Sequence, residues 1–121
     1  MKNIILTLSL IFVSLNVSAG EWKKIASNYD SSDFYIHKNS IEKSGGYGYI
    51  WILSDKKRST PLSYKTLVQV DCGPLKQIKT ISSERFKMSM GKGKGTEAYF
   101  KPGWMFIPPD NPIYKVFKYA C

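Results

Sequence analysis

The chain has only two cysteines, Cys72 and Cys121, and the second is its last residue. A bond between them would close a loop of about 50 residues, which on the chain-entropy model stabilises the folded state by roughly 4 kcal/mol. Any fold with this bond must bring the carboxyl end of the chain back beside residue 72. Whether the bond forms depends on the compartment in which the protein matures.

Residues 1–19 have the pattern of a cleavable secretory signal peptide. Lys2 supplies a positive charge, the stretch 4–17 is mainly apolar, and Val17-Ser18-Ala19 places small residues at the two positions that signal peptidase recognises. The apolar stretch of about 14 residues is shorter than the roughly 20 that a membrane-spanning helix needs. We therefore expect export through the Sec pathway and a soluble mature domain over residues 20–121. No cysteine follows the cleavage site, so we expect no lipoprotein anchor.

In an oxidising compartment the two cysteines most simply form a disulfide. The alternative is a redox-active or nucleophilic cysteine, but such residues usually lie in a C-x-x-C motif or beside a base, and the sequence has neither arrangement. The sequence therefore predicts a structural disulfide between Cys72 and Cys121. A mature chain of about 100 residues is large enough for one hydrophobic core and too small for two domains.

The charge balance is strongly basic, with 18 lysine and arginine side chains against 9 acidic ones and a formal net charge of +9. Lys2 is the only charged residue of the signal, so the mature domain keeps about +8. Such a field favours anionic partners. Outside the cytoplasm, sulfated glycans, lipid head groups and acidic proteins are met more often than nucleic acid. The alternative is that the lysines only keep a small domain soluble.

Most of the mature chain alternates apolar and polar residues with period two, which predicts short strands. A polar stretch over 37–44 holds a turn at Asn39-Ser40, Gly45-Gly46 forces a reversal, and 54–63 is a solvent loop. The connections are too short for crossover helices, so the sheet is predicted to be antiparallel. The predicted strands cover residues 22–25, 33–36, 47–53, 64–72, 75–86 and 96–100, and the third is apolar on both faces, as in a central strand.

The last segment changes to a helical period. Asn111 before Pro112 predicts the N-cap and first residue of a helix. A helix of about ten residues is marginal alone, so we expect it to pack on the sheet and to be held by the bond at Cys121. Its apolar stripe would consist of Ile113, Val116, Phe117 and Ala120.

Aromatic residues gather in two further segments. The row Tyr47, Tyr49, Trp51 would offer a stacking platform for single-stranded nucleic acid if it were exposed, but we expect it to pack under the helix, and we expect no specific nucleic-acid partner. Trp104 and Phe106 are expected to close one end of the core. The alternative is that exposed tyrosines and lysines of the helix join an edge strand in a protein interface, including a homodimer.

Two lysine-rich segments are candidate sites for an anion or a protein partner. The first is 90–96, Met-Gly-Lys-Gly-Lys-Gly-Thr, where glycines let backbone N–H groups turn toward one point and lysines add charge. Arg85 and Lys87 lie beside Lys92 and Lys94 in this candidate. The second candidate is Lys56-Lys57-Arg58. The alternative for the first segment is a mobile hairpin tip whose glycines supply positive φ angles.

The sequence offers no catalytic or metal-binding pattern. His37 is the only histidine and lies beside Lys38 at a strand end, where we expect an exposed polar role. The carboxylates are scattered, mostly at turns and strand ends, and one histidine with two disulfide-bonded cysteines does not make a zinc site. We therefore expect no catalysis, no metal and no cofactor.

Several short motifs follow one another along the chain: Trp22-x-x-Ile25, Ser40-Ile41, Tyr49-x-Trp51-x-Leu53-x-Asp55, the basic loop, Val70-Asp71-Cys72, Met90-Gly91-x-Gly93, Trp104-x-x-Ile107-Pro108 and Cys121. This ordered set resembles the surface-adhesin protein E family of Gram-negative bacteria and covers nearly the whole mature chain. The resemblance implies an α+β fold, with an antiparallel sheet of about six strands, a C-terminal α-helix packed on it, and Cys72 bonded to Cys121.

For the adhesin that gives the family its name, the resemblance also implies attachment to host matrix and serum proteins such as vitronectin and laminin. We therefore expect an exported, non-catalytic binding protein that engages a protein, a polyanionic glycan or an envelope ligand through its basic loops. The absence of a lipid-attachment cysteine leaves both the cell surface and the periplasm open. The alternative is a soluble periplasmic accessory protein with an envelope or inhibitor role, although its cationic field disfavours docking on a cationic lysozyme.

Overall fold

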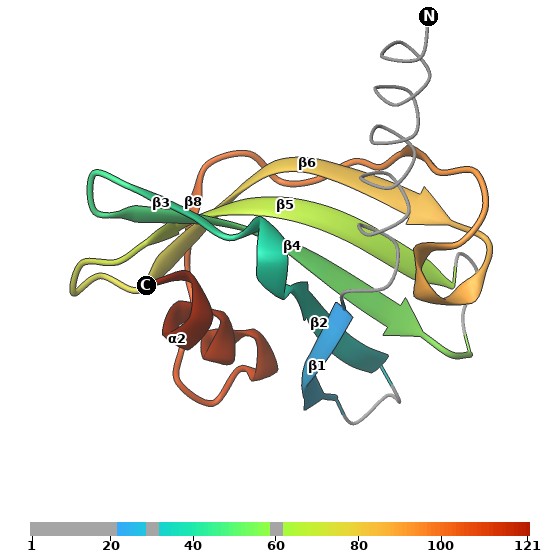
Figure 1. The fold of residues 1–121 in the computed structure, drawn as a ribbon, viewed down its shortest axis with the longest axis horizontal. Coiled ribbons are helices and arrows are strands. Elements are labelled where there is room, and N and C mark those ends of the chain that lie inside the picture. The colour runs from blue at the N-terminus through green and yellow to red at the C-terminus, as the bar shows by residue number, and fades with distance from the viewer. Residues whose placement is uncertain (1–21, 29–31, 59–61) are drawn as a thin grey trace, which may run out of the picture.

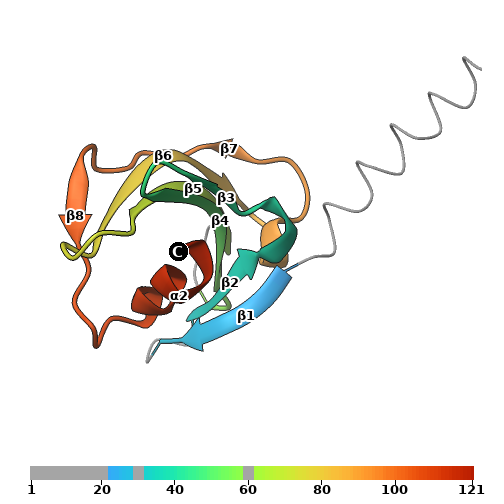
Figure 2. The same cartoon turned by 60° about the vertical axis from the view of Figure 1, so that its left-hand side comes forward.

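The structure is a computed structural model that describes residues 22–28, 32–58 and 62–121, so the expected signal peptide lies outside the described residues. One antiparallel sheet curves around a short helix near the carboxyl end (Figure 1, Figure 2). Its strands are β1 (Trp22–Ser27), β2 (Ser32–His37), β3 (Glu42–Ser44), β4 (Tyr47–Lys56), β5 (Ser63–Asp71), β6 (Gln77–Phe86), β7 (Thr96–Glu97) and β8 (Trp104–Phe106). Its helical segments are η1 (Lys38–Ser40), η2 (Ser89–Gly91), η3 (Pro112–Lys115) and α2 (Val116–Ala120).

Within the described residues the sheet has eight strands, and the expectation of about six was too low. The order is β1-β2-β4-β5-β6-β7, with β3 also paired to β4 and β8 to β6. β3 is polar and exposed along its length, so no apolar alternation marks it. It forms because Gly45 and Gly46, with φ of +58° and +83°, make the tight turn that pairs residues 42–44 with β4.

β4 occupies the centre of the sheet, as its two apolar faces predict, and pairs with β2, β3 and β5. It is longer than predicted, because residues 54–56 continue the strand instead of entering the loop. Asp55 is buried near the end of β4 and pairs with the buried Ser63 of β5. The polar character of residues 54–56 therefore marks a buried polar site at the strand end.

The carboxyl end begins as predicted, with the Asn111 side-chain oxygen accepting a hydrogen bond from the Ile113 N–H at 2.9 Å and Pro112 in the first position. The first turn is a 3-10 helix, and only α2 is α-helical. The predicted apolar stripe faces the core. The disulfide between Cys72 and Cys121 is confirmed, with their Cα atoms 5.5 Å apart.

α2 covers the face of β4 that carries Gly48, Ile50 and Ile52, which we call the inner face of the sheet. The prediction that Tyr47, Tyr49 and Trp51 pack under the helix was wrong, because alternation turns them toward the opposite, outer face. Gly48 explains why the helix packs on the inner face, since it has no side chain and lets the backbone of α2 approach closely. The inner core consists of Ile25, Ala26, Phe34, Ile36, Ile50, Ile52, Val68, Val70, Ile78, Ile107, Val116, Phe117 and Ala120.

Trp104 and Phe106 were expected to close one end of the core, and this was also wrong. Their side chains are 38% and 64% exposed, and the neighbouring Ile107 is buried instead. β8 pairs with β6 at an edge of the sheet, where no second layer covers residues 104–106. The Trp104 ring instead stacks on Tyr47 with 5.8 Å between the ring centroids.

Candidate functional site

The two lysine-rich candidate segments lie at the same end of the sheet. The register pairs Asp55 of β4 with Ser63 of β5, and Ser63 with Phe86 of β6, so the β4–β5 loop and the segment after β6 leave the sheet together. Cys72 follows the opposite end of β5, which places the disulfide at the far end of the sheet (Figure 1). The candidate site is thus well separated from the covalent link.

The first candidate segment forms a surface pocket of about 590 Å³, which we call the basic hollow. One wall comes from the end of β6 and the other from the segment that follows η2. All four cations of the first sequence candidate contribute to it, and none of its lining residues in the described part of the chain is acidic. The lining residues are Arg85, Phe86, Lys87, Met88, Lys92, Gly93, Lys94 and Thr96.

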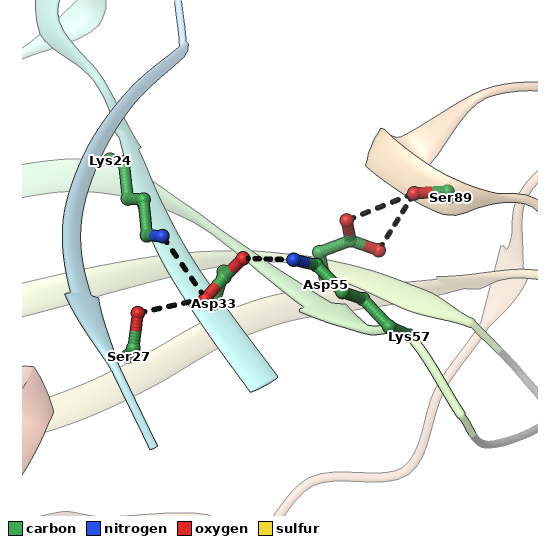
Figure 3. Close-up of polar contacts among 6 residues, drawn as sticks. All are labelled: Lys24, Ser27, Asp33, Asp55, Lys57 and Ser89. Carbon is green, nitrogen blue, oxygen red and sulfur yellow. Dashed lines mark hydrogen bonds and ion pairs between the residues drawn. The ribbon is translucent and has the colours of Figure 1, made fainter. Parts of the chain in front are cut away.

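Buried polar groups anchor the start of this segment. The Ser63 hydroxyl donates to the carbonyl oxygen of Met88 at 2.6 Å and accepts from the N–H of Gly91 at 2.9 Å. The Ser89 hydroxyl lies 2.9 and 3.0 Å from the two carboxylate oxygens of Asp55 (Figure 3). Ser63 and Asp55 are both buried, so these bonds are at least partly shielded from water and fix η2 on the outer face of the sheet.

Gly91 and Gly95 are required by close contacts. Gly91 is buried and has φ of +65°, a conformation that strains other residues, and a Cβ there would displace the Lys65 side chain. A Cβ on Gly95 would lie 2.6 Å from the Phe86 ring. The hairpin-tip alternative expected positive φ angles at the glycines of residues 90–96, and Gly91 and Gly93 show them whereas Gly95 does not. The close packing of the segment against β5 and β6 was not predicted.

The cations of the basic hollow are not neutralised by acids within the described residues, where both ion pairs are made by Asp33. The Arg85 guanidinium donates to the hydroxyl of Thr96, its partner in the β6–β7 pairing, at 3.1 Å. This bond orients the guanidinium. Lys87, Lys92 and Lys94 are exposed. Their charges are therefore available to a ligand.

The second candidate segment is arranged differently, because two of its three cations contact separate side chains outside the segment. The Lys57 ammonium lies 2.9 Å from a carboxylate oxygen of Asp33 (Figure 3), and the Lys56 ammonium lies 5.2 Å from the centre of the Tyr64 ring. Arg58 is exposed in the turn after β4. The segment therefore adds positive charge at the end of the sheet that carries the basic hollow, and none of its three cations lines that hollow.

Asp33 is the centre of the second polar network. Its carboxylate accepts from the Ser27 hydroxyl at 2.8 Å and lies 3.4 Å from the Lys24 ammonium, besides the contact with Lys57 (Figure 3). The pKa of Asp33 is lowered from 3.8 to about 2, mainly by Lys57 and then by Ser27 and Lys24. Burial of the carboxylate only partly opposes this shift. The same contact raises the pKa of Lys57.

A second surface pocket, of about 280 Å³, lies on the outer face of the sheet and was not predicted from the sequence. Side chains from β1, β2, β4, β5 and β6 line it. They include two tryptophans that are far apart in the sequence. His37 lies in this pocket half-buried, in an edge-to-face contact with Trp22 at 5.2 Å, and not in the exposed position expected for it. The lining residues are Trp22, His37, Ser40, Trp51, Lys65 and Glu84.

The described ranges contain no cluster of three or more histidine, cysteine, aspartate or glutamate side chains suited to a metal ion. In the same ranges, no helix has the length and apolar character needed to cross a membrane.

The model of the surface-adhesin protein E family matches residues 22–121, which include every described residue. The chain belongs to this family. This result confirms the resemblance drawn from the motifs and the two cysteines.

The adhesin E family member is similar in fold to two solved structures of protein E from Haemophilus influenzae. The first has a TM-score of 0.63 and 13% sequence identity, with 82% of each chain covered. The second, in crystal form II, has a TM-score of 0.65 and 12% identity, with 84% of this chain and 87% of that chain covered. Such identities show a shared fold alone. No curated protein sequence matches the chain.

Proposed function

We propose that this adhesin E family member is an exported, non-catalytic binding protein that holds an anionic partner in the basic hollow. The observation that carries the proposal is that Arg85, Lys87, Lys92 and Lys94 line one pocket, whose lining by the described residues includes no acidic side chain. Four cations that converge on one concave surface attract an anion far more strongly than the same charges scattered over the domain. The membership in an adhesin family supports binding over catalysis.

The partner we propose is a host matrix or serum protein, or a sulfated glycan. Lysine ammonium groups act as point charges that tolerate varied anion geometry, while Arg85 offers a planar fork suited to a carboxylate or sulfate. Phe86 and Met88 give the hollow an apolar floor beside its charges. An acidic protein surface with an apolar side chain, or the ring of a sulfated sugar, satisfies both features.

We place the mature protein outside the cytoplasm. The signal-like residues 1–19 support export, and the disulfide between Cys72 and Cys121 supports maturation in an oxidising compartment. The family name supports a position at the cell surface. The test is protease treatment of intact cells: degradation supports display at the surface, and protection until the outer membrane is opened places the protein in the periplasm.

The binding proposal is tested with residues 20–121 on immobilised heparin as a polyanion probe and on immobilised vitronectin as a protein probe. We expect retention that weakens as salt rises. The double variant Lys92→Glu, Lys94→Glu is expected to lose most of the retention. Its matched control is Lys38→Glu, Lys101→Glu, which makes the same change in net charge at exposed lysines outside the hollow.

If both double variants lose retention equally, the binding follows net charge and the basic hollow is not the site. If the unaltered protein binds neither probe at low ionic strength, the proposed function is wrong.

A further inference from the structure

We propose that the pocket lined by Trp22 and Trp51, which we call the aromatic hollow, binds one pyranose ring of a glycan. This site is separate from the basic hollow, and the two share no lining residue. The proposal does not depend on the binding of a polyanion. It rests on which side chains the sheet brings together on its outer face.

The strand register explains how the aromatic hollow forms. Trp22 of β1 pairs with His37 of β2, and Lys65 of β5 pairs with Glu84 of β6. Trp51 lies between them on the central strand β4 and points to the same outer face. α2 covers only the inner face of the sheet (Figure 2), and on the outer face η1 contributes Ser40 to the lining of the hollow.

The aromatic rings supply the apolar wall of the hollow. Trp22 and Trp51 are each half-buried, so the packing that holds each ring leaves part of its surface open. The face of an aromatic ring is electron-rich and attracts positively polarised groups. The Lys65 ammonium, 5.9 Å from the centre of the Trp22 ring and 5.1 Å from that of Phe86, shows this attraction at both rings. A pyranose ring presents a face of polarised C–H bonds, which matches such a wall.

The rim of the hollow supplies hydrogen-bonding groups of both kinds. The Lys65 ammonium only donates and the Glu84 carboxylate only accepts. The Ser40 hydroxyl donates to the His37 carbonyl oxygen at 3.1 Å, which leaves its own oxygen able to accept. Sugar hydroxyl groups both donate and accept, so they can use all three partners.

The charges of the aromatic hollow favour a neutral sugar over a polyanion. Lys65 and Glu84 carry opposite charges, whereas four cations and no acid line the basic hollow. The Glu84 carboxylate would repel a sulfate or phosphate group. The volume of about 280 Å³ lies near the lower limit of ligand pockets, which is about 300 Å³. The aromatic hollow therefore fits a single uncharged ring.

Tryptophan fluorescence gives a direct test. The chain has three tryptophans, and Trp104→Phe removes the one outside the aromatic hollow, so the remaining emission comes from Trp22 and Trp51. This protein is titrated with the methyl glycosides of glucose, galactose, mannose and N-acetylglucosamine. We expect a saturable change with at least one of them, and no weakening of binding as the salt concentration rises.

The variants locate the binding. Trp51→Ala is expected to weaken sugar binding about tenfold or more, as measured by ligand-observed NMR, because it removes one aromatic wall. Trp51→Phe is expected to keep part of the affinity, and Glu84→Gln, at an exposed position, tests the rim without disturbing the core. Lys92→Glu, Lys94→Glu is expected to leave sugar binding unchanged, because these lysines line only the basic hollow.

Circular dichroism shows whether each variant is folded. If Trp51→Ala does not fold, Trp22→Ala on the edge strand β1 takes its place. The proposal fails if none of the four glycosides gives a saturable signal with the folded protein. It also fails if binding survives unchanged in the tryptophan and Glu84 variants.

Discussion

The backbone of Gly48 in β4 lies directly against the backbone of Ala120 in α2, so closely that a Cβ on Gly48 would overlap the Ala120 carbonyl group. This contact sets the side of the sheet on which the helix rests. Gly48→Ala is expected to lower the free energy of unfolding by about 1–3 kcal/mol, because the helix must shift to admit the methyl group. Urea denaturation of the disulfide-bonded protein measures the loss.

Gly46→Ala is the control for this variant, because Gly46 has φ of +83° but a Cβ added there would meet nothing within 4 Å. It should cost about 1–2 kcal/mol through backbone strain alone. Hydrogen exchange at the amides of residues 116–120 separates the two effects, since it should speed up in Gly48→Ala and not in Gly46→Ala. Equal exchange in both variants would show that the helix does not depend on this contact.

The disulfide between Cys72 and Cys121 spans a sequence separation of 49 residues, and α2 has only five residues. Replacing both cysteines by serine is expected to lower the free energy of unfolding by roughly 4 kcal/mol on the chain-entropy model. Urea denaturation with and without reductant measures this. Reductant should destabilise the native protein and leave the double serine variant unchanged. If the unreduced native protein reacts with an alkylating agent at both sulfurs, the bond is absent.

Much of the fold could be predicted, because the patterns that carry it are local. Period-two alternation located the main strands, and Asn111-Pro112 with its apolar stripe located the terminal helix. β3 could not be predicted in the same way, since its three exposed residues owe their pairing to the neighbouring turn. The face covered by the helix also escaped prediction, because a missing side chain at Gly48 outweighed the aromatic row beside it.

The candidate site was predictable to the extent that its residues are neighbours in the sequence. Arg85 to Lys94 form one hollow because they lie on two sides of a single short loop. The aromatic hollow draws Trp22 and Trp51 from separate strands, so only the register of the sheet brings them together. The anchoring of the loop by Ser63 and Asp55 was not predicted either. Both residues fall in a segment whose polar composition predicts a solvent loop.

Asp33 predicts a pH dependence of stability. Its pKa is lowered from 3.8 to about 2 in the folded protein, mainly by Lys57. The folded state therefore binds the proton more weakly than the unfolded chain, so this stabilisation is complete above pH 3.8 and is lost as the pH falls toward 2. Because Lys57 and Lys24 are about half exposed, we expect a contribution of about 1 kcal/mol.

Urea midpoints at several values of pH across this window measure the effect. Asp33→Asn should flatten the profile, and Asp110→Asn, which removes an exposed carboxylate outside the ion pairs, should not. Identical slopes for the native protein and Asp33→Asn would contradict the assignment.

The Ser63 hydroxyl joins the two ends of the η2 turn, through Met88 and Gly91, and its removal tests whether the basic hollow needs a fixed shape. Ser63→Ala leaves the Gly91 N–H without its acceptor in a buried position, so we expect a loss of about 1–3 kcal/mol in the free energy of unfolding.

The substitution changes no charge. We nevertheless expect elution from heparin at lower salt, because Lys92 and Lys94 lose their common orientation. Thr66→Val removes a hydroxyl of the same strand that bonds Ser83 and is the control. Unchanged elution of a destabilised Ser63→Ala protein would mean that the loop binds through its charges alone, whatever its conformation.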